Sequence, residues 1–148
     1  MNPAPWLVAT VHVSGTTRDP FADESLPIGE RLFLGGEDSV RSFTRDDLGP
    51  RDANGDPTGG LTRLYGNIEL RFRPFPRHRA FEFATFYDVG MVHEDPWSVG
   101  GPAGQAIGAG LRYRTPVGPI RFDYGYNPGD RLGADHPYAL HLAVGFAF

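Results

Sequence analysis

The sequence lacks cysteine and lysine entirely. None of the 148 residues is a cysteine, which excludes a disulfide framework, a thiolate nucleophile and cysteine-ligated zinc. All cationic side chains that are charged at neutral pH are arginines, the formal net charge is −4, and no basic run exceeds Arg77-His78-Arg79. Because a phosphate-binding surface needs a basic excess or a concentrated basic stripe, we expect no nucleic-acid partner.

Long hydrophobic runs are also missing. No stretch reaches the roughly 20 apolar residues that a transmembrane helix requires. The first ten residues carry no arginine or lysine ahead of an apolar core, so the chain shows no cleavable secretory signal. Glycine and proline occupy 20 and 14 positions, but an aromatic content of 13% is too high for a disordered chain. A membrane role would therefore have to be carried by strands.

Six segments show a period of two, the signature of strands whose alternate side chains point to opposite faces of a sheet. One face of each is large and apolar, whereas the other combines glycine and alanine with arginine, aspartate and glutamate. Each segment has roughly 8 to 12 residues, which suits a tilted strand that crosses a bilayer. The apolar faces are Leu7, Ala9, Val11 and Val13; Leu64, Ile68, Leu70 and Phe72; Phe81, Phe83, Thr85, Tyr87, Val89 and Met91; Ile107, Ala109, Leu111 and Tyr113; Ile120, Phe122, Tyr124 and Tyr126; and Tyr138, Leu140, Leu142, Val144, Phe146 and Phe148.

The connections between these segments alternate in length. Residues 74–78 and 115–118 form tight turns, residues 92–104 and 127–136 form longer loops, and residues 15–60 form a very long one. Short turns on one side and long loops on the other are typical of outer-membrane barrels. We therefore predict an all-β, antiparallel portion of a transmembrane β-barrel, with a strand within residues 1–14, the long loop at 15–60 and five strands within 61–148.

A water-soluble β-sandwich or lipocalin-like barrel also alternates and has to be weighed. In such a protein the outward polar face usually carries lysine, threonine, serine and glutamate. Here that face carries small residues and charged residues with no lysine, which is better suited to a crowded polar lumen. Tyrosines near the segment ends also fit the aromatic girdles at membrane interfaces.

A set of short motifs occurs in a fixed order between residues 30 and 126. They are Arg31-Leu-Phe-Leu-Gly-Gly36, Ser39-Val-Arg-Ser-Phe43, Gly49-Pro-Arg-Asp52, Pro57-Thr-Gly-Gly60, Asn67-Ile-Glu-Leu-Arg-Phe72, Phe86-Tyr-Asp-Val-Gly90, and Gly110-Leu-Arg-Tyr-Arg-Thr-Pro-Val-Gly-Pro-Ile-Arg-Phe-Asp-Tyr-Gly-Tyr126. Together they resemble the C-terminal barrel portion of the Omp85 superfamily, the BamA and TamA type of outer-membrane assembly protein.

This resemblance implies a function as well as a fold. Barrels of that family have sixteen strands, so the six here would correspond to the last six. The chain would act without enzymatic chemistry in inserting or translocating outer-membrane proteins, and it would reside in the bacterial outer membrane. Its partners would be membrane lipids and unfolded outer-membrane protein clients, with accessory assembly lipoproteins or the missing barrel strands as further ones.

The resemblance also implies that the long loop folds back into the barrel lumen. The matching loop tip is Val40-Arg41-Ser42-Phe43, and the family's arginine pairs with acidic residues that correspond to Glu69 and Asp88. The residues agree with this, because both carboxylates fall on the polar phase of their strands and a guanidinium can bridge two such groups. Ser42 stands where the family usually has glycine, which would be unfavourable if the backbone there needs a positive φ.

The last segment is similar to the C-terminal β-signal of outer-membrane proteins. The polar residue of that signal corresponds to His141, and its two aromatic residues correspond to Phe146 and Phe148; Ala143 replaces the usual glycine. An ordinary amphipathic closing strand would look the same. Both interpretations are compatible, because the assembly machinery recognises an unpaired strand edge by β-augmentation.

The sequence offers little other chemistry. Asp52-Ala-Asn-Gly-Asp56 resembles part of a calcium loop, but Arg63 stands where a bidentate glutamate is expected, so we predict a turn. No nucleophile motif or phosphate-cradling loop is present, and the histidines have no metal-ligand spacing. We therefore predict no catalytic residue, cofactor or metal. The five histidines are His12, His78, His93, His136 and His141.

Several alternatives stay open. Within the superfamily, the chain could belong to a two-partner secretion transporter or to the barrel half of a membrane-tethered lipase. From a different class, it could be a small stand-alone soluble or pore-forming β-protein. Because the smallest outer-membrane barrels close with eight strands, six strands predict an incomplete module with two open edges that would promote association.

Overall fold

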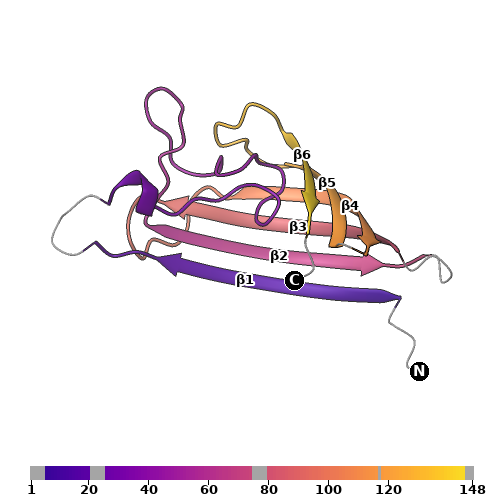
Figure 1. Cartoon of the computed structure of the whole chain (residues 1–148). Coiled ribbons are helices and arrows are strands. Elements are labelled where there is room, and N and C mark those ends of the chain that lie inside the picture. The colour runs from indigo at the N-terminus through magenta and orange to yellow at the C-terminus, as the bar shows by residue number, and fades with distance from the viewer. Residues whose placement is uncertain (1–5, 21–25, 75–79, 117, 146–148) are drawn as a thin grey trace.

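The computed structural model describes residues 6–20, 26–74, 80–116 and 118–145, and its strands form one antiparallel sheet. Its six strands follow one another in chain order, each paired with the next, so that β1 and β6 form the two edges (Figure 1). This confirms the prediction of an all-β chain with six antiparallel strands. The strands are β1 (Leu7–Thr17), β2 (Thr62–Phe72), β3 (Phe81–His93), β4 (Gly104–Thr115), β5 (Gly118–Tyr126) and β6 (Tyr138–Val144).

The sheet carries its large apolar side chains on the outside. Exposed examples on the last strand are Leu140 at 58% and Leu142 at 71%. Charged side chains on the opposite phase are buried, among them Glu69, Asp88 and Asp123. A sheet that faces apolar outward and charged inward is the reverse of a water-soluble barrel and matches a barrel wall in lipid.

β1 ends later than the sequence predicts. It runs from Leu7 to Thr17 instead of ending at residue 14, because it pairs residue for residue with β2 up to the Thr17–Thr62 pair. The connection that follows contains a short 3₁₀ helix, η1 (Ile28–Glu30). Among the described residues, no helix is long and apolar enough to span a membrane.

The connection between β1 and β2 folds back over the inner face of the sheet (Figure 1). It is held in a hairpin-like path by the bridges Leu32–Gly60 and Leu34–Leu48. The turn after Leu34 depends on Gly35, whose φ is 111° and where a Cβ would approach Thr44 O to 2.3 Å, so an L-residue would be strained there.

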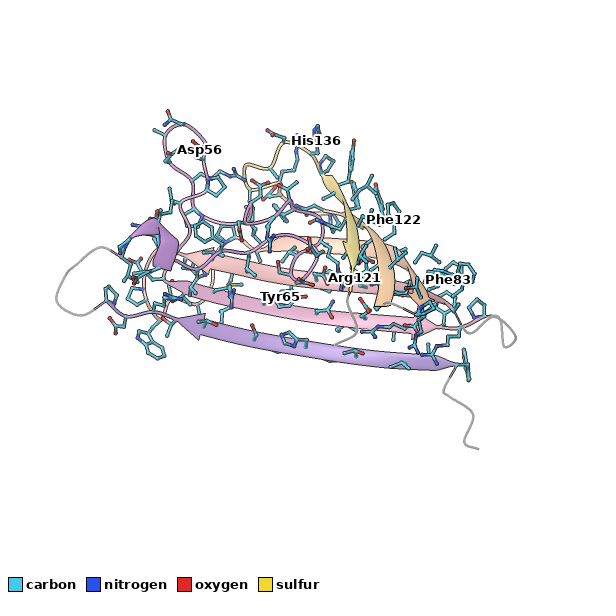
Figure 2. All side chains as sticks on the ribbon, in the orientation of Figure 1. Asp56, Tyr65, Phe83, Arg121, Phe122 and His136 are labelled. Carbon is cyan, nitrogen blue, oxygen red and sulfur yellow. The ribbon has the colours of Figure 1, made fainter. Side chains whose placement is uncertain are left out.

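The buried apolar core lies between this loop and the inner face of the sheet. Its members from the loop are Leu34, Val40, Phe43 and Leu48, and those from the sheet are Phe86, Val92 and Ala106. Side chains in Figure 2 fill this space between loop and strands. The loop is therefore the second layer of the fold, and its tip is placed by apolar packing.

Candidate functional site in the barrel lumen

The loop tip Val40–Phe43 is buried against the inner face of the sheet. Val40 and Phe43 are 0% and 1% exposed. Two glycines make room for them: a Cβ on Gly90 of β3 would come within 2.8 Å of Val40 Cγ2, and one on Gly104 of β4 within 2.7 Å of Phe43. The apolar side chains of Val40 and Phe43, on either side of Arg41, thus hold it against the inner face of the sheet.

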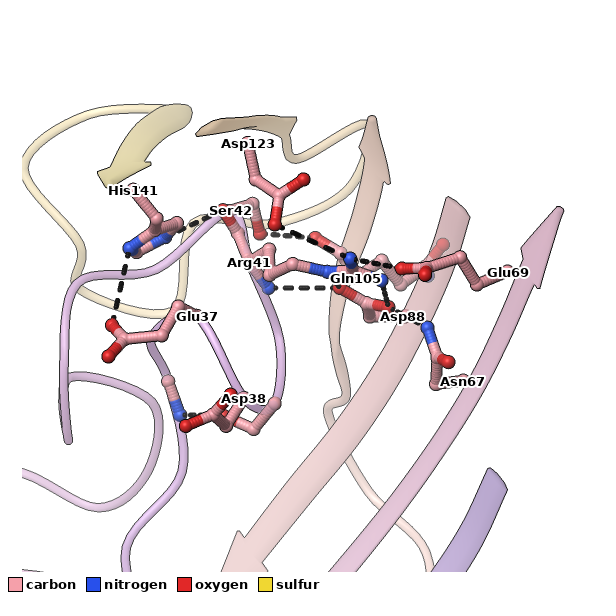
Figure 3. Close-up of polar contacts among 12 residues, drawn as sticks. Glu37, Asp38, Arg41, Ser42, Asn67, Glu69, Asp88, Gln105, Asp123 and His141 are labelled. Atoms are coloured by element: carbon pink, nitrogen blue, oxygen red, sulfur yellow. Dashed lines mark hydrogen bonds and ion pairs between the residues drawn. The ribbon is translucent and has the colours of Figure 1, made fainter. Parts of the chain in front are cut away.

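Arg41 joins the loop to two strands through its guanidinium (Figure 3). Its Nε and Nη2 donate to the two carboxylate oxygens of Asp88 on β3, each at 2.9 Å, and Nη1 donates to Glu69 on β2 at 2.6 Å. The backbone N–H of Arg41 also donates to Asp88, at 3.1 Å. The structure therefore brings together the arginine and the two acidic residues singled out in the sequence.

The pKa of the Arg41 guanidinium is raised above its ordinary value. Burial would lower it, but the hydrogen bonds and negative charges of Asp88 and Glu69 outweigh that effect. Arginine is already protonated at any physiological pH, so the tip carries a permanent buried charge. A buried charge of this kind is stable only while its partners remain in place.

Four further residues complete the site without having been assigned to it from the sequence. Phe86 of β3 lies beneath the guanidinium, with the Arg41 Cζ 3.3 Å from the ring centroid. Asn67 donates to Asp88, and Arg112 binds both Asp123 and, at 3.4 Å, Glu69.

The polar phase of the strands could have indicated Asn67, Arg112 and Asp123. Phe86 could have been found as the one aromatic residue on the otherwise small or charged phase of residues 82–90. The sequence pattern leaves open which of these groups would meet, because that depends on how far the sheet curves.

The backbone of the tip contacts the other half of the sheet. The carbonyl of Arg41 lies 3.1 Å from His141 Nε2 on β6, and a Cβ on Gly125 of β5 would come within 2.1 Å of the same oxygen. Ser42 donates from its hydroxyl to the carbonyl of Gln105 on β4. Ser42 has no positive φ, so the expected penalty for replacing glycine there does not arise.

The predicted β-signal is only partly within the described residues. His141 lies on the inner face of β6, in register with Asp123 of β5. Phe146 and Phe148 lie outside the described residues. Gly145 N donates to Pro119 O at 2.8 Å, so the pairing of the last strand with β5 is described up to residue 145.

A metal site and the segment 52–56 are the other features that the sequence raised. In the part of the chain that the structure describes, no group of three or more histidine, aspartate or glutamate side chains is placed to hold a metal ion. Residues 52–56 form a turn in which Asp52 Oδ1 accepts the N–H groups of Asn54 and Asp56, the conformation expected for such a sequence.

Comparison with known proteins identifies the family of this sheet and its lumen loop. The model of the Omp85 superfamily domain matches residues 4–148. The chain belongs to the Omp85 superfamily. The chain is also similar to a curated protein, the outer membrane protein assembly factor BamA of Nitratidesulfovibrio vulgaris (strain Hildenborough). The two sequences are 28% identical over 127 residues, which cover 83% of this chain and 16% of that protein.

A solved Omp85 structure has the same fold. BamA from Haemophilus ducreyi lacking POTRA domains 1–3 superposes with a TM-score of 0.74 at 17% sequence identity, over 91% of this chain and 31% of that one. The chain thus spans about a sixth of the length of the curated BamA that it matches. These matches confirm the predicted superfamily, and they show that the sheet has the fold of part of a BamA barrel.

Proposed function

We propose that this segment forms the last six strands of a sixteen-stranded Omp85 barrel that inserts or translocates unfolded outer-membrane proteins. The loop tip would hold the lumen wall in one curvature, and the open edge of β6 would lie at the seam where an incoming strand pairs by β-augmentation. This process makes and breaks no covalent bond. Its partners would be outer-membrane lipids and client proteins, together with the other barrel strands and accessory assembly lipoproteins.

The observation that carries the proposal is the buried Arg41. Arg41 is 3% exposed and lies against the inner face of a sheet whose outer face is apolar. Its three ion-pairing bonds to β2 and β3 cost desolvation that a plain structural contact would not need. Such a group is justified if the loop must sit at one defined place in the lumen.

The experiment is reconstitution of the full-length protein in lipid vesicles. The rate of client insertion would be followed by protease protection of an unfolded outer-membrane protein. Arg41→Ala should slow insertion about tenfold or more, because the tip loses its bonds to Asp88 and Glu69. Arg114→Ala is the matched control, since Arg114 also faces the lumen but its side chain is 59% exposed.

The outcome that would contradict the proposal is equally defined. Arg41→Ala protein that migrates as a folded barrel in unheated electrophoresis samples and inserts clients at the wild-type rate would remove the loop tip from the mechanism. Wild-type protein that inserts no client faster than protein-free vesicles would remove the assembly function itself.

A further inference from the structure

Arg41 contacts the two halves of the sheet through different atoms. Its guanidinium binds Glu69 of β2 and Asp88 of β3, whereas its carbonyl oxygen faces Gly125 of β5 and His141 of β6. These residues lie on two pairs of neighbouring strands, β2–β3 and β5–β6, which β4 separates in the sheet. One loop residue therefore spans the curvature of the wall from its second strand to its last.

We infer that His141 is the positioning residue that couples the loop tip to the last strand. Its Nε2 is the group on β6 that meets the Arg41 carbonyl, at 3.1 Å, and its Nδ1 lies 3.9 Å from Glu37 Oε2 on the same loop. Figure 3 shows the ring of His141 between Glu37 and the backbone of the tip. The consequence for assembly rests on the proposed function, but the positioning itself does not.

The local geometry gives His141 this role. Gly125 has no side chain, so the tip backbone can lie directly against β5; a Cβ there would also meet Ser42 N at 2.9 Å. With the tip seated so low, the imidazole of the adjacent strand reaches the Arg41 carbonyl. This carbonyl belongs to a buried residue, and a buried acceptor without a donor is costly.

After His141, the last strand borders an open cavity. Ala143 and Val144 line this cavity of about 730 Å³ together with Arg112 and Arg121. β6 is also an edge strand that pairs on one side with β5. The bond from His141 to the tip is thus well placed to restrain the strand that, in the proposed function, presents its edge to clients.

The test is amide hydrogen exchange on the full-length protein in detergent micelles, read peptide by peptide. His141→Phe keeps a planar ring but removes the donor, so exchange over residues 138–144 should rise roughly fivefold, the factor that a lost neutral hydrogen bond corresponds to. Exchange over residues 81–93 of β3 should stay within twofold of wild type.

Two companion variants separate positioning from general loss of structure. His141→Gln can place its amide N–H near the position of Nε2, so it should restore wild-type exchange over residues 138–144. His12→Phe is the matched control, because His12 lies on the inner face of β1, with its ring 5.7 Å from that of Tyr65. It should leave exchange in β6 unchanged.

Each outcome decides the inference. Unchanged exchange of β6 in His141→Phe, or equal increases in β3 and β6, would overturn it, and so would a failure of His141→Gln to rescue. If His141→Phe loosens β6 while wild-type protein inserts no client in the vesicle assay, the positioning role stands and the assembly function fails.

Discussion

The guanidinium of Arg41 lies over the ring of Phe86, with 3.3 Å between the Arg41 Cζ and the ring centroid. Phe86 and Asp88 are two residues apart on β3 and therefore project from the same face. One strand thus supplies both the aromatic ring below the cation and the carboxylate at its edge. The buried guanidinium therefore donates hydrogen bonds to carboxylates and also has a cation–π contact with the ring.

Replacing Phe86 should weaken the docked tip. Phe86→Leu keeps an apolar side chain but removes the ring, and it should cost about 1–2 kcal/mol of unfolding free energy, since a desolvated cation–π contact is worth that much. The measurement is urea unfolding of the full-length protein in vesicles. Phe83→Leu on the outward phase of the same strand is the control, and equal losses in both would contradict the role of Phe86.

Lysine should not substitute for Arg41. Lys keeps the charge but lacks the planar fork that binds Asp88 through two nitrogens while reaching Glu69. Arg41→Lys should therefore lower the free energy of unfolding by about 3–5 kcal/mol, close to the effect of removing one partner of a buried ion pair. The temperature at which heated samples stop migrating as a folded barrel in electrophoresis measures this loss of stability. A melting profile identical to wild type would show that charge alone suffices.

A methyl group on Gly125 should displace the loop tip. Its Cβ would come within 2.1 Å of the Arg41 oxygen and 2.4 Å of the Arg41 carbonyl carbon, both backbone atoms. Gly125→Ala should lower the free energy of unfolding by about 1–3 kcal/mol, the usual penalty for overpacking. Gly66→Ala is the control, because its nearest neighbour, Val89 Cγ1, is at 3.5 Å. Limited proteolysis of the loop at 18–61 should rise in the first variant alone.

Restoring glycine at position 42 should destabilise the tip. Ser42 is 2% exposed and donates its hydroxyl proton to Gln105 O, and its φ is not positive, so glycine gains nothing there. Ser42→Gly should lower the free energy of unfolding by about 1–2 kcal/mol, because it removes the hydrogen bond and also adds conformational entropy to the unfolded state. Ser42→Ala separates the two, since it removes the bond alone. Higher stability of the glycine variant in urea would contradict this account.

Period-two patterning determined which way the side chains point but not where the strands stop. Leu140 and Leu142 face outward, and Glu69 and Asp88 inward, as the alternation predicts. The end of β1 depends on its partner: Gly15 to Thr17 continue the strand because residues 62–64 of β2 pair with them. Cross-strand pairing of this kind is a long-range property that local sequence does not carry.

The sequence by itself determined the all-β class, the two faces of every strand and, through ordered motifs, the superfamily. The same resemblance marked Arg41, Glu69 and Asp88, and the inward phase of the two carboxylates agreed with it. Only the tertiary structure decided that Phe86, Arg112 and Asp123 gather around the same guanidinium and that His141 meets its carbonyl. The reason is that contacts across four strands depend on sheet curvature and loop path, which packing over the whole chain sets.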